Sequence, residues 1–337
     1  MYRGKKVLDV HGHQTTPPEF EQFGNQLLRL RKLHGDDRLV LADDLVTAAV
    51  QPHVALLDQR QVDLQLLSPR PVDMWHWEVP EVQTVWCRAT NDVTNQICRL
   101  FPGRFAGMAQ LPQHVSTSTA NCIQELDRCI NELGFVGAIV NPDPGADGRA
   151  PTMADEYWYP LYEWAEEAGV VLMIHGSISR DPRWAMVPHG YQVNNVISQY
   201  IATLTLENSD VFAHFPNLKT YVCHLGGSLN RWPKEDLEHQ YGTLPVSNLK
   251  FDSVAYDAGF LELGIRQKGA DRVLFGSECP GAGTGTVIKE PGKPDRASDD
   301  LLPVIDAMEF LTDDEKLDIV HNNALKFFPL LASKVTD

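Results

Sequence analysis

The chain has few basic residues and no long apolar stretch. It contains 29 lysines and arginines against 45 aspartates and glutamates, which gives a formal net charge of −16. Because nucleic acids and anionic membrane surfaces are bound through lysine and arginine, we expect neither as a partner. No stretch approaches the roughly 18 consecutive apolar residues that a membrane-spanning helix needs, so we expect no membrane span.

Secretion signals and disulfide patterns are also missing. The first residues, Met1–Lys6, lead directly into a short strand-like run rather than an apolar secretory region, so we expect no signal peptide. The six cysteines form no C-x-x-C pair, and the 337-residue chain is long enough to bury a large core without them. We therefore expect free thiols in a reducing compartment and predict a cytoplasmic protein.

Short apolar runs recur along the chain, and each ends at a polar or Gly/Pro-marked turn. Most show little alternation of apolar and polar residues, which is typical of strands buried on both faces. We predict eight strands, at residues 7–10, 62–67, 105–111, 136–140, 170–174, 220–223, 249–254 and 272–276.

Helical patterns, with apolar residues three and four positions apart, lie between several of these runs. We predict helices at residues 119–133, 157–168 and 260–268. Alternating strands and helices indicate crossover connections and a parallel sheet. Eight such strands favour a (β/α)8 TIM barrel formed by residues 1–337 as a single domain. A doubly wound sheet is the alternative, but it would not normally place polar residues after so many strands.

Three intervals are too long for simple connections: residues 14–61, 178–217 and 280–300. Each follows the carboxyl end of a predicted strand, so we expect helical or loop insertions at that face of the barrel, where active sites are built. The last interval contains two glycine- and proline-rich segments, and we interpret it as a mobile flap. It is not a phosphate loop, because it lacks the G-K-[ST] ending and a following helix.

Histidine and glutamate side chains follow four of the predicted strands. His11 and His13 end the first strand, and residues two apart in a strand point to the same face. His175 and His224 follow the fifth and sixth strands, and Glu278 follows the eighth. Taken singly, each histidine is more simply a hydrogen-bonded residue. Together, imidazoles and a carboxylate at one rim of a barrel predict a site for zinc or another divalent metal.

This pattern resembles the metal-dependent amidohydrolase superfamily, in the branch that includes aminocarboxymuconate-semialdehyde decarboxylase and related aromatic-acid decarboxylases. Residues 104–109 (RFAGMA) and 319–324 (IVHNNA) resemble the same branch, so the likeness spans nearly the whole chain. It implies a barrel with one catalytic divalent metal, normally zinc, with manganese as the alternative. A homodimer is also implied by this likeness.

The resemblance assigns roles by position. His11, His13 and His175 resemble the metal ligands, and His224 resembles the acid/base histidine that is not a ligand. Glu278 occupies the position of the carboxylate after the eighth strand. It could ligate the metal, deprotonate the metal's water, or do both in sequence.

One departure from the family pattern bears on the reaction. The strand-eight carboxylate is usually Asp in a G-[ST]-D-x-P sequence, whereas residues 276–281 read GSECPG. This segment is similar to that of 4-oxalomesaconate hydratases, which act in bacterial degradation of lignin-derived protocatechuate and gallate. The likeness implies addition of water to an unsaturated keto or enol tricarboxylic acid, with His224 and Glu278 as the catalytic residues.

The same chemistry can be argued from the residue types. A metal in an open site lowers the pKa of water from 15.7 toward about 7. Histidine, with an ordinary pKa of about 6.5, can move protons in the working range. A polycarboxylate also needs cationic partners, and arginine matches a carboxylate with two hydrogen bonds. Candidates near strand ends are Arg70, Arg180, Arg183 and Arg231, with Ser68, His189, Tyr191 and Asn194 as neutral partners.

Three alternatives to a zinc-dependent hydratase remain open at this point. The same residues would serve a nonoxidative decarboxylase of an aromatic or muconate-type acid, in which the ring carbon is protonated before carbon dioxide leaves. The second alternative is hydrolysis of a lactone or amide, a reaction that is more general in the superfamily. A barrel that binds a metal or an anion without turnover is the non-enzyme alternative.

Overall fold

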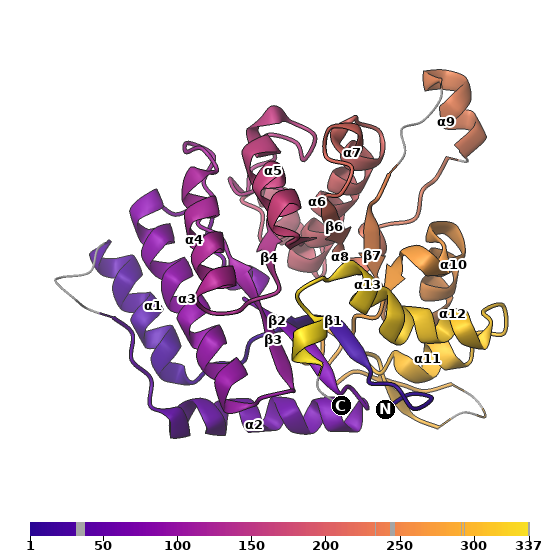
Figure 1. Cartoon of the computed structure of the whole chain (residues 1–337), viewed down its shortest axis with the longest axis horizontal. Coiled ribbons are helices and arrows are strands. Elements are labelled where there is room, and N and C mark those ends of the chain that lie inside the picture. Colours follow the sequence, from indigo (N-terminus) through magenta and orange to yellow (C-terminus); the bar gives the residue numbers. More distant parts are fainter. Residues whose placement is uncertain (32–37, 233, 243–246, 291, 293, 336–337) are drawn as a thin grey trace.

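The computed structural model describes residues 1–31, 38–232, 234–242, 247–290, 292 and 294–335. Its centre is one sheet of eight parallel strands, ordered in the sheet as in the chain (Figure 1). Each strand overlaps one of the eight predicted apolar runs. The strands are β1 Leu8–His13, β2 Leu64–Ser68, β3 Phe105–Gln110, β4 Gly137–Val140, β5 Val171–Ile174, β6 Lys219–Val222, β7 Lys250–Asp252 and β8 Val273–Leu274.

Hydrogen bonds between β1 and the segment after β8 close this sheet into a barrel. The backbone N–H of Val10 donates to the carbonyl of Phe275 at 2.8 Å, and that of Glu278 donates to the carbonyl of His11 at 2.9 Å. An open doubly wound sheet would instead leave two free edges. The predicted (β/α)8 TIM barrel is therefore confirmed.

Helices surround the strands (Figure 1). The α-helices are α1 Pro18–Leu30, α2 Asp43–Gln59, α3 Pro80–Leu100, α4 Ala120–Asn131, α5 Tyr159–Ala168, α6 Gly190–Glu207, α7 Val211–His214, α8 Cys223–Gly226, α9 Lys234–Tyr241, α10 Ala258–Lys268, α11 Leu302–Asp306, α12 Asp313–Leu317 and α13 Asn323–Phe327. Short 3-10 turns are η1 Pro71–Asp73, η2 Glu156–Trp158, η3 Pro182–Met186, η4 Ala270–Arg272 and η6 Ala332–Lys334, and η5 Asp318–Asn322 is a π turn.

The three helices predicted from periodicity are present. Residues 119–133 correspond to α4, and residues 260–268 fall within α10. The helix predicted at 157–168 is split into the 3-10 turn η2 and the helix α5. The side chain of Asp155 accepts a hydrogen bond from the backbone N–H of Tyr157, which caps η2 and separates it from what precedes.

The three long intervals carry the expected insertions. Residues 14–61 contain α1 and α2, and residues 178–217 contain η3, α6 and α7. Within residues 280–300, β9 (Val287–Ile288) pairs antiparallel with β10 (Arg296–Ala297). Residues 291 and 293 of this segment lie outside the described residues.

The amino-terminal end of the barrel is filled by apolar side chains from the end of the chain. Phe327, Phe328 and Leu331 form one buried cluster with residues of the strands, among them Leu8 and Tyr221, and the Phe327 ring lies under Lys219 and Lys250, the first residues of β6 and β7. The ring of Phe328 lies 5.9 Å from that of Tyr221. Because this end is closed by packing, the carboxyl end is left for a cavity.

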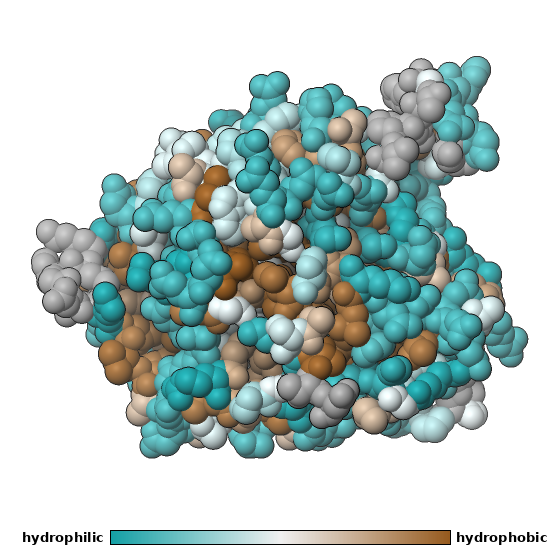
Figure 2. All heavy atoms as spheres, in the orientation of Figure 1, coloured by the Kyte–Doolittle hydropathy of each residue, from teal (hydrophilic) through white to brown (hydrophobic). Residues whose placement is uncertain are grey.

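Hydrophilic side chains dominate the face of the molecule shown in Figure 2, with apolar side chains gathered near its middle. Across the described part of the chain, no helix combines the length and the apolar character required to cross a bilayer.

The packing at the amino-terminal end generates a stability prediction. Phe328 is fully buried, so Phe328→Ala is expected to lower the free energy of unfolding by about 3–5 kcal/mol through lost burial and a cavity. Leu263→Ala on α10 is the control, because that side chain is 56% exposed. Urea denaturation measures both, and equal losses for the two variants would contradict the assignment of Phe328 to the core.

Candidate metal and active site

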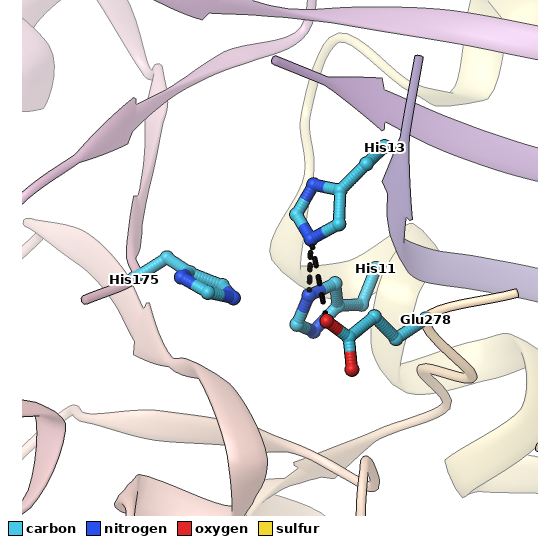
Figure 3. Close-up of side chains that lie close together, drawn as sticks. All are labelled: His11, His13, His175 and Glu278. Carbon is cyan, nitrogen blue, oxygen red and sulfur yellow. Dashed lines mark hydrogen bonds and ion pairs between the residues drawn. The ribbon is translucent and has the colours of Figure 1, made fainter. Parts of the chain in front are cut away.

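The side chains of His11, His13, His175 and Glu278 point toward one another at the carboxyl end of the barrel (Figure 3). One nitrogen or oxygen atom from each lies within 4.8 Å of those of the other three. Nε2 of His13 lies 3.2 Å from Nε2 of His11 and 3.7 Å from Oε1 of Glu278. Two residues at the end of β1 and one residue after each of β5 and β8 are thus brought to a common centre.

The second ring nitrogen of each of these histidines contacts an acceptor oxygen. The Nδ1 contacts are His11 to Asp252 Oδ2 at 2.7 Å, His13 to the Pro69 carbonyl at 3.0 Å, and His175 to the Gly176 carbonyl at 2.6 Å. Because a carbonyl or carboxylate oxygen can only accept, each Nδ1 carries the ring proton. Each Nε2 therefore presents a lone pair to the centre, as metal-ligating histidines do.

This donor set fits a divalent cation. Lone pairs on the Nε2 atoms of His11 and His13, 3.2 Å apart, would repel each other unless a cation or a shared proton lies between them. Ligands about 2.0 Å from a tetrahedral zinc ion are themselves about 3.3 Å apart, close to the separation seen here. Burial lowers the pKa of His13 and of His175 below the ordinary histidine value, so both rings are neutral at pH 7 and able to ligate.

His224 lies beside this cluster, on the wall of the cavity. Its Nε2 is 3.3 Å from Nε2 of His175, and its backbone N–H donates to Oδ1 of Asp252 at 2.7 Å. Its backbone is left-handed, with φ 53° and ψ 47°, so the chain turns sharply after β6. Gly227 follows in the same turn, where a Cβ atom would lie 2.0 Å from the carbonyl of Val196 on α6. Burial lowers the pKa of His224.

Behind the cluster, Asp9 links the first strand of the barrel to the segment that follows the last strand. Its carboxylate accepts hydrogen bonds from the backbone N–H groups of His11 and Ser277, from Ser277 Oγ at 2.5 Å and from Gln65 Nε2 at 2.8 Å. Burial raises the pKa of Asp9 to about 6, so it still accepts as an anion at pH 7. The Gln65 side chain packs against Gly12. A Cβ atom at position 12 would lie 2.1 Å from Cδ of Gln65.

A cavity of about 1270 Å³ opens onto His13, His224 and Glu278. Each of the three long insertions contributes to its wall, for example through Glu21, Tyr191 and Gly281. Among the described residues that line this cavity, Arg70 is the single arginine or lysine. The cavity wall therefore offers one protein cation, whose side chain is 54% exposed and lies 3.9 Å from Asp73.

Two of the predicted substrate-binding residues, Arg70 and Tyr191, line the cavity. Ser68 lies behind the cluster instead, with Oγ 2.9 Å from Nδ1 of His13. Asn194 donates from Nδ2 to the carbonyl of Ser177 at 2.8 Å, and its neighbour Asn195 lines the cavity.

Arg183 lies on η3, away from the cavity wall. Its side chain is 85% exposed and pairs with Asp181. Arg180, His189 and Arg231 are likewise not among the residues that line the cavity.

Asp252 and Tyr256 are among the residues of the site that were not predicted. Asp252 ends β7 and contacts both His11 and the backbone of His224. A carboxylate at the end of an apolar run, the signal that identified Glu278, would have found it. Tyr256 lines the cavity, and its hydroxyl donates to Oε2 of Glu278. Its contact depends on the path of the loop after β7, for which the sequence gives no signal.

Comparisons with known proteins identify the family of the chain. Residues 8–330 match the family described as amidohydrolase. The chain is 31% identical to 2-keto-4-carboxy-3-hexenedioate hydratase from a Sphingobium species, over 98% of each chain. It is 25% identical to 2-amino-3-carboxymuconate-6-semialdehyde decarboxylase from Dictyostelium discoideum, over 82% of this chain and 76% of that protein.

A solved structure is similar over the whole chain as well. The crystal structure of 4-oxalomesaconate hydratase from Rhodopseudomonas palustris superposes with a TM-score of 0.84. It is 28% identical in sequence, and the superposition covers 98% of this chain and 97% of that one.

The different positions of His175 and His224 predict different effects on metal content. His175→Asn removes one of the four converging atoms and is expected to reduce bound divalent metal well below that of the wild type. His224→Asn removes a ring outside that set and is expected to leave metal content unchanged. Elemental analysis of the purified variants measures both, and loss of metal from His224→Asn would make His224 a ligand.

Proposed function

Because the chain belongs to the amidohydrolase family, we propose that it is a hydratase that adds water to an unsaturated keto or enol polycarboxylic acid of the 4-oxalomesaconate type. The likeness to two hydratases over almost the whole length of both chains carries this proposal. The decarboxylase relative is less similar and aligns over a smaller share of each chain. Such a reaction would serve bacterial catabolism of aromatic compounds.

His11, His13, His175 and Glu278 would hold one divalent cation. Three imidazoles and a carboxylate suit zinc, with manganese as the alternative. If one position on the cation beyond these ligands is left to water, the cation would supply hydroxide at neutral pH by lowering the pKa of that water. The outer contacts from Asp252, Pro69 and Gly176 keep the three rings in the orientation and tautomer that ligation needs.

His224 and Glu278 would carry the protons of the reaction. Hydration places a hydroxyl group on one carbon of the double bond and a proton on its neighbour. His224, which reaches the cavity beside the centre, would deliver that proton from Nε2 to carbon. Glu278 would accept the proton that the attacking water loses, and return of a proton from Glu278 to His224, directly or through solvent, would balance the protons over the cycle.

Arg70 would bind a carboxylate of the substrate. The chain carries a net charge of −16, so an anionic substrate depends on local positive charge at the cavity. Arg70 supplies this at the wall together with the cation, and Tyr191 and Asn195 add neutral hydrogen-bonding groups. An arginine fork also fixes the orientation of the carboxylate relative to the reacting carbons.

A carboxy-lyase is the second candidate, favoured by the decarboxylase relative. A substrate panel separates the two activities. With a conjugated oxo-acid of the 4-oxalomesaconate type, we expect absorbance of the conjugated system to fall while no carbon dioxide is released. Release of carbon dioxide from an aromatic or muconate-type acid without hydration would instead establish decarboxylation, and consumption of none of the acids by the metal-loaded protein would overturn both.

In the same assay, His224→Asn is expected to lower kcat by about 10²–10⁴-fold, the usual contribution of a general acid or base. The variant keeps the four converging atoms, so the loss would be in proton transfer. Turnover of His224→Asn at the wild-type rate would remove His224 from the mechanism.

Carboxylate binding by Arg70 is tested separately. Arg70→Ala removes a charge-assisted contact and is expected to raise KM by about 10- to 100-fold with a smaller effect on kcat. Arg183→Ala is the matched control, because the Arg183 side chain is exposed and pairs with Asp181. An unchanged KM for Arg70→Ala would contradict the role of Arg70. An equal rise of KM in both variants would show that Arg183 also binds the substrate.

A further inference from the structure

The two carboxylate oxygens of Glu278 have different partners. Oε1 lies 3.7 Å from Nε2 of His13 and faces the candidate metal centre. Oε2 accepts a hydrogen bond from the hydroxyl of Tyr256, which stands on the loop after β7 and lines the cavity. The backbone of Glu278 is fixed as well, because its N–H donates to the carbonyl of His11 at 2.9 Å. Tyr256 is therefore the partner of the oxygen that does not face the centre.

Tyr256 is itself held in place by the segment after β8. A Cβ atom at Gly283 would lie 2.6 Å from Cε1 of the Tyr256 ring, so this backbone passes directly against the ring. A Cβ atom at Gly281 would lie 2.7 Å from Cγ of Glu278. The two glycines thus lie over the two hydrogen-bonded side chains with no room for a larger residue.

Buried hydrogen bonds anchor this glycine segment to the body of the protein. The carbonyl of Gly283 accepts from Ser298 Oγ at 2.8 Å, and Oγ1 of Thr284 donates to Oδ2 of Asp299 at 2.7 Å. Asp299 is fully buried and pairs through Oδ1 with Nε of Arg60 at 2.8 Å. The position of the Tyr256 ring is thereby tied to a buried ion pair.

We infer that Tyr256 is a positioning residue for Glu278: its hydroxyl keeps Oε2 turned away from the metal centre, so that Oε1 alone faces the cation. This inference rests on the proposed function, in which Glu278 both ligates and takes a proton. A carboxylate with both oxygens free can rotate or bind a cation through both oxygens. A fixed donor on Oε2 removes that freedom and leaves one ligating oxygen in a defined orientation.

Tyr256→Phe tests this role, because it removes the hydroxyl and keeps the ring. With cobalt(II) in place of the native metal, visible absorption reports the coordination geometry without any substrate. We expect Tyr256→Phe to retain a full complement of cobalt but to show an altered spectrum, and to lower kcat by about 10-fold or more with little change in KM. An unaltered spectrum, an unaltered kcat or loss of the metal would each overturn the inference.

Two further variants separate positioning from general loss of structure. Gly283→Ala keeps the hydroxyl but forces the Tyr256 ring to shift, so its cobalt spectrum should change in the same direction as that of Tyr256→Phe. Tyr162→Phe is the matched control, because Tyr162 is a buried tyrosine on α5 whose hydroxyl donates to the carbonyl of Met153 at 2.6 Å. It should leave the spectrum and kcat unchanged, and a spectral change there would overturn the assignment to Tyr256.

The cobalt spectrum also separates this inference from the proposed function. If the wild-type protein hydrates none of the acids in the panel, the proposed reaction fails, whereas the spectra of Tyr256→Phe and Gly283→Ala still decide whether Tyr256 orients Glu278. If hydration is found but those spectra match the wild type, the reaction stands and the positioning role is wrong.

Discussion

The candidate site depends on the hydrogen bonds that join the first strand to the chain after the eighth. Two of its histidines lie on β1 and its carboxylate lies just after β8, so these groups meet only when the barrel closes. Backbone hydrogen bonds from Val10 and Glu278 make this closure. The Asp9 carboxylate adds to it by accepting hydrogen bonds from the N–H groups of His11 on β1 and of Ser277 after β8. The contacts that close the sheet therefore also set the distance from His11 to Glu278.

The sequence alone was sufficient for the barrel and for the four converging residues because both follow from strand ends. Buried parallel strands appear as apolar runs, and the residues that follow them share one rim whatever the lengths of the connections. The eight strands were found in this way, as were His11, His13, His175 and Glu278 together with His224, whereas the exclusion of His224 from the ligands came from the family resemblance. No measurement of side-chain orientation was needed for these predictions.

Groups farther from the strand ends could not be located by the same reasoning. The wall of the cavity depends on how long insertions fold back over the rim, and one residue of register decides which side chain faces inward. Asn195 rather than Asn194 lines the cavity for this reason, since neighbouring residues of α6 point in different directions. Arg183 follows β5 in sequence but lies on a turn that leads its side chain into solvent.

The net charge of the molecule is negative, whereas binding of an anionic substrate needs positive charge at the cavity. An excess of acidic residues keeps the surface hydrated, as the hydrophilic face in Figure 2 illustrates, but it disfavours the approach of an anion. Positive charge would be concentrated instead at Arg70 on the cavity wall and at the cation that we propose for the centre where imidazoles and a carboxylate converge. Recognition of a polycarboxylate would then be local and short in range.

The close approach of Gln65 on β2 to Gly12 on β1 makes the choice of residue at one position depend on the residue at the other. The residue between the two histidines of β1 has no space for a side chain, because the amide that binds Asp9 occupies it. Positions 12 and 65 therefore form a linked pair for protein engineering. A library that randomises position 12 alone would return glycine, and larger residues there become accessible only when position 65 is shortened in the same clone.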